Sequence, residues 1–220
     1  MVISFNSIKG GVGKSTLATT MAGWLASQGK DVLLVDGDDQ ETSSDFTAWR
    51  EQTLGNTGYT LVNMTGANLR KQVEAMKPKY DHIIIDTGGR DTTSQRAALS
   101  VADVSMIPFV PRSFDLWTIT KVTDLIDEIQ SIRAEPLVAY TFLSRADIRS
   151  ADNRDVAEAL SQISQLTYLA YPISNRKAIS NAAGLGLTPF EGENIDRKAT
   201  KEIEDLFNRV LNGNDITASA

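Results

Sequence analysis

Short apolar runs alternate with helix-length amphipathic segments along most of the chain. Apolar runs rich in β-branched residues predict strands, and apolar residues at helical spacing predict helices. The strands are expected at residues 1–5, 31–36, 80–86, 104–108, 137–143 and 166–171, and the helices at 17–26, 116–132, 156–163 and 203–211. This alternation predicts right-handed crossovers and an α/β fold in three layers, with a mostly parallel twisted sheet covered by helices on both faces.

A glycine-rich segment separates the first expected strand from the first expected helix. Residues 9–16 read KGGVGKST. The glycines allow consecutive N–H groups to point inward, where they and the helix N-terminus can hold a di- or triphosphate. Lys14 would then reach the β and γ phosphates, and the Ser15 hydroxyl would ligate Mg²⁺. The predicted nucleotide-binding residues are Lys9, Gly10, Gly11, Val12, Gly13, Lys14, Ser15 and Thr16.

The loop departs from the usual pattern for phosphate-binding loops. Isoleucine stands at position 8, where that pattern has its first glycine, and a second lysine stands at position 9. Lys14 already supplies a cation at the β/γ bridge, so Lys9 indicates another task. KGGVGKST resembles the deviant Walker A box of the ParA/MinD ATPases. That resemblance implies a P-loop NTPase fold, ATP as the nucleotide, and a sandwich homodimer in which Lys9 reaches the partner subunit's ATP.

Two further strands end in carboxylates at the edge of the sheet where the phosphate loop is expected. DVLLVD ends at Asp36, and YDHIIID ends at Asp86. Ligands of open α/β sheets bind at this edge, so Asp86 fits the Walker B role of holding Mg²⁺. By the resemblance, Asp36 lies near the metal and Asp38 activates the attacking water. The predicted metal set is Ser15, Asp36 and Asp86, and the predicted catalytic set is Lys9, Lys14 and Asp38.

Three other loops are candidates for the same site. The turn Thr87-Gly88-Gly89 is either a second nucleotide-sensing switch or an ordinary strand-to-helix turn. The loops after Leu143 and Tyr171 are the places to look for contacts with adenine. No guanine-specifying motif is recognised, so the preference for ATP over GTP rests on the resemblance.

Composition narrows the class of protein. The 220 residues are 41% apolar and 23% charged, which fits one globular domain, assigned to residues 1–212 with a polar tail at 213–220 that is expected to be disordered. The absence of cysteine excludes disulfides, thiolate zinc sites and iron–sulfur clusters. The absence of a leader or a long apolar stretch predicts a cytoplasmic protein. The first helix starts at the loop, so the chain resembles the short ParA type without an N-terminal helix-turn-helix domain.

A basic set near the C-terminus is the candidate surface for DNA. Cations that contact phosphates without reading bases would bind duplex DNA nonspecifically. Net charge is −6 and acids are interleaved with these residues, so a solvated mixed-charge face explains them equally well. The last residues carry no basic amphipathic helix, which disfavours membrane attachment. The candidates are Arg176, Lys177, Arg197, Lys198 and Lys201.

The sequence as a whole predicts a ParA-type ATPase for plasmid or other DNA segregation. It would hydrolyse ATP to ADP and phosphate slowly, associate with the nucleoid when bound to ATP, and respond to a ParB-like centromere-binding partner. The alternatives are a positioner of a protein cargo, a metabolic P-loop enzyme and a noncatalytic nucleotide-binding module. The tryptophans at positions 24, 49 and 117 are interpreted as core or interface anchors, and His82 as a packing residue.

Overall fold

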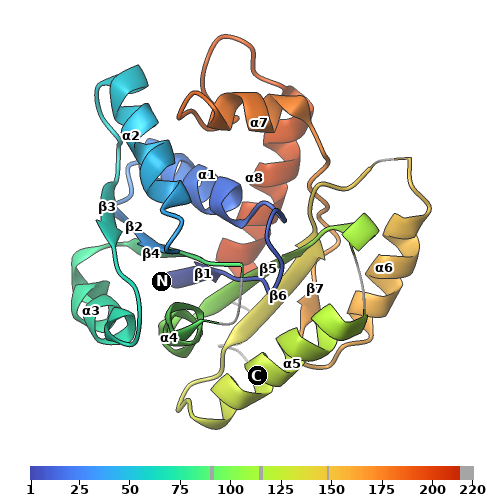
Figure 1. Ribbon diagram of the computed structural model, residues 1–220. Helices are drawn as coiled ribbons and strands as arrows, with labels where there is room; N and C mark the ends of the chain where they lie inside the picture. Colours follow the sequence, from blue (N-terminus) through green and yellow to red (C-terminus); the bar gives the residue numbers. More distant parts are fainter. Residues whose placement is uncertain (90–91, 114–115, 148, 214–220) are drawn as a thin grey trace.

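Seven parallel strands form one sheet at the centre of the molecule (Figure 1). The computed structural model describes residues 1–89, 92–113, 116–147 and 149–213, so the predicted disorder of the tail at 214–220 lies outside the described residues. The order across the sheet is β3-β2-β4-β1-β5-β6-β7, and every pairing of named strands is parallel. The strands are β1 Val2–Phe5, β2 Val32–Gly37, β3 Thr60–Asn63, β4 His82–Thr87, β5 Val104–Phe109, β6 Val138–Leu143 and β7 Thr167–Tyr168.

Helices cover both faces of the sheet, as predicted. In Figure 1, α1, α2, α7 and α8 lie on one side, and α3, α4, α5 and α6 lie on the other. The described helices are α1 Lys14–Ser27, α2 Thr42–Leu54, α3 Asn68–Met76, α4 Thr93–Val101, α5 Leu116–Ser131, α6 Asp152–Ser161, α7 Lys177–Ala183 and α8 Arg197–Asn212. Two short 3₁₀ turns occupy Lys77–Lys79 and Pro111–Ser113.

Successive strand residues pack alternately into two separate hydrophobic cores, one on each face of the sheet. In β4, Ile83 and Ile85 pack into the core that includes residues of α3 to α6, whereas Ile84 packs into the core of α1 and α8. All three isoleucines are buried. A parallel strand covered on both faces has no solvent side, which explains why its sequence is continuously apolar.

The strand order brings the phosphate loop and the two acid-ended strands together. β4 lies between β1 and β2, and Asp36 and Asp86 are paired in register at the carboxyl ends of β2 and β4. The loop after β1 emerges beside them, because Phe5 is paired with Asp86. This neighbourhood is the edge at which open α/β sheets bind ligands.

The aromatic side chains divide between core and surface. Trp24 is buried, with its ring centroid 5.5 Å from that of Phe207 and 6.4 Å from that of Phe190, so it is a core anchor. Trp49 and Trp117 are 56% and 81% exposed, so a place in this chain's core is wrong for both, and a place at an interface stays a prediction. His82 begins β4 and is partly buried, which agrees with packing. Within the described ranges, no helix has the length and apolarity needed to cross a bilayer.

Candidate functional site

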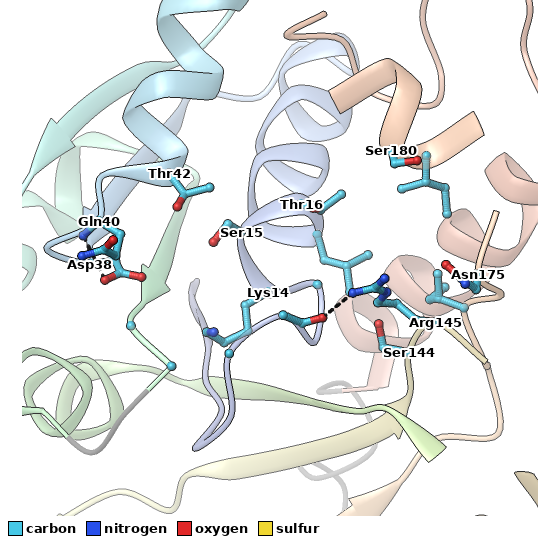
Figure 2. A pocket seen from close by; sticks show the side chains of 18 of the residues that line it. Lys14, Ser15, Thr16, Asp38, Gln40, Thr42, Ser144, Arg145, Asn175 and Ser180 are labelled. Carbon is cyan, nitrogen blue, oxygen red and sulfur yellow. Dashed lines mark hydrogen bonds between the residues drawn. The ribbon is translucent and has the colours of Figure 1, made fainter. Parts of the chain in front are cut away.

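The segment after β1 forms a glycine-dependent loop that ends in α1. Gly11 and Gly13 have φ of 74° and 94°, in the left-handed region that favours glycine. The carbonyl of Gly11 accepts a hydrogen bond from Arg145 Nη1 at 2.7 Å (Figure 2). The carbonyl of Val12 accepts one from Ser144 Oγ at 2.8 Å. These bonds tie the phosphate loop to the segment that follows residue 143.

A cleft of about 890 Å³ opens over this loop. Residues of the phosphate loop and the first turn of α1 form its floor, and Asp38 and Gly88 line it from the loops after β2 and β4 (Figure 2). Its far end is lined by Ser144 and Asn175, from the loops after β6 and β7. Both loops proposed as places for adenine therefore reach the same cleft, whose size suits a nucleotide.

Lys14 places a buried cation at the cleft. Its side chain lines the cleft although the residue is only 6% exposed. Burial lowers the pKa of its ammonium, and the charges of Asp86 and Asp38 oppose that shift. A buried ammonium is costly unless an anion pairs with it, so this lysine is suited to receive a phosphate.

Asp86 is fully buried beneath the loop. Its Oδ2 accepts a hydrogen bond from Ser43 Oγ at 2.8 Å, while no described residue bonds its buried Oδ1. Burial raises the pKa of this carboxyl to about 6, against hydrogen bonds from Ser15 and Ser43 and the charge of Lys14. A buried oxygen without a partner fits Mg²⁺ or a water bound to it.

No group of three or more metal-ligating His, Cys, Asp or Glu residues occurs in the described part of the chain. Ser15 and Asp86 would therefore hold Mg²⁺ together with phosphate oxygens and water, which is the usual pattern for this ion. Asp36 is placed differently from Asp86. Its Oδ2 accepts bonds from Ser44 N and Oγ at 2.8 and 2.7 Å, and its Oδ1 accepts one from Asp38 N at 3.2 Å. These contacts position the start of α2, and the metal role of Asp36 stays a prediction.

Asp38 lies at the cleft between two glycine-containing loops. Its Oδ1 accepts a hydrogen bond from Gln40 N at 3.1 Å, and a Cβ on Gly88 would lie 3.2 Å from the same oxygen. A Cβ on Gly89 would lie 3.0 Å from both N and Cα of Gly10. The turn after β4 thus touches both Asp38 and the phosphate loop, although its function as a switch stays a prediction.

Lys9 does not line this cleft. It lines a separate small pocket beside β5, together with Phe109 and Val110. Its carbonyl accepts a hydrogen bond from Ser7 Oγ, which fixes the backbone at the start of the loop. A side chain outside its own cleft agrees with the predicted task at a second site, which remains untested.

The predicted basic set is not a uniform row of free cations. Arg176 lines the cleft and its Nη2 donates to Glu202 Oε1 at 2.6 Å, while its Nη1 lies 3.7 Å from Asp196 Oδ2. Lys201 pairs with Asp205 at 2.9 Å. Arg176 is therefore held by carboxylates in this structure, because α8 places Glu202 beside it, and its contact with DNA stays a prediction. Lys177, Arg197 and Lys198 are exposed, and DNA binding through them stays a prediction.

Four residues of the site were not singled out individually from the sequence. Ser43 and Ser44 tie α2 to the two acid-ended strands, and Ser144 and Arg145 hold the phosphate loop. The latter two begin the loop after Leu143, which the sequence proposed for adenine, since parallel strands bring all their carboxyl ends to one edge. Their hydrogen bonds to the phosphate loop were not predicted.

Magnesium-dependent nucleotide binding is expected to weaken at acidic pH. Because the pKa of Asp86 rises from 3.8 to about 6 in the folded protein, a proton competes with Mg²⁺ below about pH 6. Without nucleotide, the free energy of unfolding should decrease as pH rises from about 4 to about 6. The reason is that the carboxyl of Asp86 holds its proton more tightly in the native state than in the unfolded chain. Titrating MgADP between pH 5 and pH 8 should show affinity falling up to about tenfold per unit below about pH 6.

Asp86→Asn provides the baseline for that titration, because the nucleotide's own phosphates titrate in the same range. The variant should bind MgADP more weakly than wild type at pH 8 and should show only the nucleotide's pH dependence. Equal pH profiles for both proteins would contradict the role assigned to Asp86.

Comparison with known proteins gives a consistent picture. The chain matches the CobQ/CobB/MinD/ParA nucleotide binding domain over residues 3–212. It is 23% identical over 206 residues to the maintenance of carboxysome distribution protein A of Halothiobacillus neapolitanus, covering 93% of this chain and 94% of that protein. It is 26% identical over 189 residues to the chromosome partitioning protein ParA of Myxococcus xanthus, covering 67% of each. Its fold is similar to that of a McdA variant of Cyanothece solved in complex with ATP, with a TM-score of 0.74, 16% identity and 95% of each chain covered.

Proposed function

The chain belongs to the CobQ/CobB/MinD/ParA nucleotide-binding domain family, and from that premise we propose that it is an ATP-driven switch of the ParA type. The observation that carries the proposal is a nucleotide-sized cleft lined by Lys14 and Ser15, with Asp86 buried beside them and one of its oxygens bonded by no described residue. Together these groups supply a cation for the phosphates and two oxygen ligands for Mg²⁺. The ATP bound to the Cyanothece protein supports the choice of nucleotide.

Different residues of the chain would have different roles in hydrolysis. The loop N–H groups and Lys14 hold the phosphates and neutralise the charge that develops on them. Ser15 and Asp86 would hold Mg²⁺, which supplies further charge neutralisation when bound. Asp38 lies at the mouth of the cleft, where its carboxylate orients water for attack. Hydrolysis yields ADP and phosphate, and slow turnover suits a switch that must persist until a partner arrives.

The active form in this proposal is a homodimer closed over two nucleotides. Lys9 does not line its own cleft, and by its place in the deviant Walker A box it would contact the nucleotide of the partner subunit. The dimer would bind DNA nonspecifically through exposed cations that include Lys177, Arg197 and Lys198. A ParB-like centromere-binding protein would stimulate hydrolysis and release it. This cycle would segregate a plasmid or another DNA cargo on the nucleoid.

A protein cargo is the second candidate function. The alignment with the relative named for carboxysome distribution covers 93% of this chain, whereas the alignment with the chromosome partitioning relative covers 67%. The same switch would serve either cargo, because the choice lies in the partner protein. A metabolic enzyme of the same family would need a second substrate beside the nucleotide, and a noncatalytic module would not need Asp38 at the cleft.

Nucleotide-dependent dimerisation and DNA binding test this proposal together. Sedimentation and binding to nonspecific duplex DNA are measured in Mg²⁺ at fixed salt with ADP, ATP and a nonhydrolysable ATP analogue. Dimers that bind DNA only with a triphosphate are expected. Dimers without DNA binding would favour the protein-cargo function, and the absence of any triphosphate-dependent change would overturn the switch.

Lys9→Ala separates the dimer contact from nucleotide binding in the same experiment. The variant should bind the ATP analogue, because Lys9 does not line its own cleft, but should remain monomeric. Lys71→Ala is the matched control, since Lys71 is an exposed lysine on α3 and should leave both properties unchanged. Normal dimers of Lys9→Ala would refute the contact across the dimer.

A further inference from the structure

A polar stripe runs along the buried face of α2. Ser43, Thr47 and Arg50 follow each other at spacings of four and three residues, so they share one side of the helix. They are 0%, 6% and 4% exposed. The buried side of a helix in a globular protein is normally apolar, and polar groups placed there need partners.

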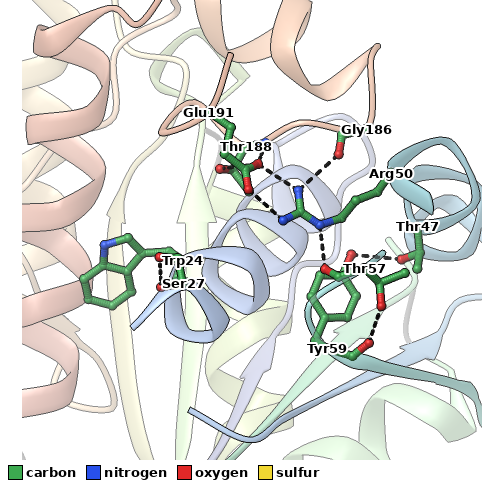
Figure 3. A network of polar contacts seen from close by, with 9 residues as sticks. All are labelled: Trp24, Ser27, Thr47, Arg50, Thr57, Tyr59, Gly186, Thr188 and Glu191. Atoms are coloured by element: carbon green, nitrogen blue, oxygen red, sulfur yellow. Dashed lines mark hydrogen bonds and ion pairs between the residues drawn. The ribbon is translucent and has the colours of Figure 1, made fainter. Parts of the chain in front are cut away.

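Each member of the stripe bonds a different part of the molecule. Ser43 Oγ donates to Asp86 Oδ2 at 2.8 Å, and Thr47 Oγ1 lies 3.0 Å from the Tyr59 hydroxyl. Arg50 meets Glu191 with two parallel bonds of 2.7 Å (Figure 3). The stripe therefore connects the metal carboxylate of the cleft to a loop that is 141 positions away from Arg50 in the sequence.

At the Arg50 end, the loop at 186–191 packs closely against α2. Arg50 Nη1 also donates to the carbonyl of Gly186 at 3.3 Å, and a Cβ on Gly186 would come within 2.3 Å of Arg50 N. Glu191 Oε2 accepts further bonds from Thr188 N and Oγ1 at 2.8 and 2.9 Å (Figure 3). The loop at 186–191 is thus fixed directly against the backbone of α2.

The other end of α2 is tied to the catalytic loop. Ser44 bonds Asp36 through its N–H and its hydroxyl, and Asp36 also accepts the N–H of Asp38. Helix α2 is continuous over its 13 residues, Thr42–Leu54, and so includes both Ser44 and Arg50. A displacement of Ser43 would therefore be transmitted along the helix to Arg50.

We propose that α2 is a rigid lever between Asp86 and the loop at 186–191, with Arg50 and Glu191 as positioning residues. The ion pair holds α2, and with it Asp38, in place over the cleft. In return, loading the cleft shifts the loop at 186–191. This inference rests on the proposed nucleotide function, because Mg²⁺ with a nucleotide is what moves the first end of the lever.

Hydrogen exchange on the full chain tests the lever, with Mg²⁺ and a nonhydrolysable ATP analogue as the probe. In wild type, the analogue should slow exchange in the loop at 9–16 and change it at 184–192. The test variant is Arg50→Met with Glu191→Gln, because removing both charges avoids an unpaired buried ion and glutamine still accepts from Thr188. In this variant, the response at 9–16 should persist and the response at 184–192 should disappear. Its kcat for ATP should fall about tenfold or more with nucleotide affinity unchanged.

Two further variants keep the test decisive. Arg133→Met is the matched control, because Arg133 is another partly buried arginine, which bonds the carbonyls of Leu99 and Ala102 away from α2 at 2.6 and 2.8 Å. It should change neither the exchange response nor kcat. If the double variant melts early, Arg50→Lys keeps the charge without the paired geometry and should give an intermediate loss of both.

The outcomes separate the lever from the function on which it rests. A double variant that responds at 184–192 as strongly as wild type would show that the signal passes through α7, whose Ile179 and Ser180 also line the cleft, and would overturn the lever alone. No response at 9–16 in wild type would overturn nucleotide binding, and the lever with it.

Discussion

Asp38→Ala is expected to bind ATP as wild type does and to lose turnover, with kcat falling ~10²-fold or more, the scale of a lost general base. The carboxylate lines the cleft and is oriented by Gln40 N. Because it is an anion like the phosphates, it is not expected to contribute to their binding. Removing it should therefore leave affinity intact and remove the group that orients water. Single-turnover hydrolysis and equilibrium binding of ATP, measured on the same preparation, check both halves of the expectation.

Asp39→Ala is the control for that result. Asp39 is an exposed carboxylate one position along the same loop, and it also lines the cleft. The substitution removes the same unit of negative charge from the same loop without removing the proposed base. A normal rate in Asp38→Ala, or an equal loss in Asp39→Ala, would show that the hydrolytic role is assigned to the wrong residue.

Lys14→Gln is expected to have the largest effect on nucleotide binding. The ammonium is buried at the floor of the cleft, where it would pair with the phosphates of the nucleotide. Removing one partner of such a buried charge pair costs about 2 kcal/mol or more of binding free energy, which corresponds to a ~30-fold loss of affinity. The glutamine also removes a buried charge from the nucleotide-free protein, so its melting temperature should not fall. Calorimetric titration with MgATP and thermal melting without nucleotide measure the two effects.

Lys30→Gln makes the same chemical change at an exposed position outside the cleft. It should leave both the affinity and the melting temperature unchanged. Normal ATP affinity in Lys14→Gln would mean that the phosphates lie elsewhere. A large fall in its melting temperature would instead assign Lys14 a structural role.

The parts of the site that could be predicted from sequence are those set by local rules. A glycine-rich turn between a strand and a helix, and acids at the ends of apolar strands, are local patterns. The structure brings Lys14 and Asp38 to one cleft, with the buried Asp86 close enough to Lys14 for their charges to interact. The parallel sheet covered on both faces was likewise predicted from the alternation of segments, and the structure confirms it.

The parts that were missed depend on contacts far apart in the sequence. The bounds of helix α2 could not be predicted from apolar spacing, because polar residues occupy its buried face and its apolar periodicity is weak. Strand β3 was missed because its residues are only partly buried at the edge of the sheet, and β7 contains two residues where six were expected. The pairing of Arg176 with Glu202 depends on the packing of α8, which no local pattern encodes.

The short outer strands have a consequence for how the protein behaves at high concentration. β3 has four residues and β7 has two, so the sheet offers little unpaired backbone at either margin. Long, flat outer strands are what allow one chain to extend the sheet of another and to aggregate. The protein should therefore remain free of amyloid-type assemblies during concentration, and any ordered self-association has to use side-chain surfaces.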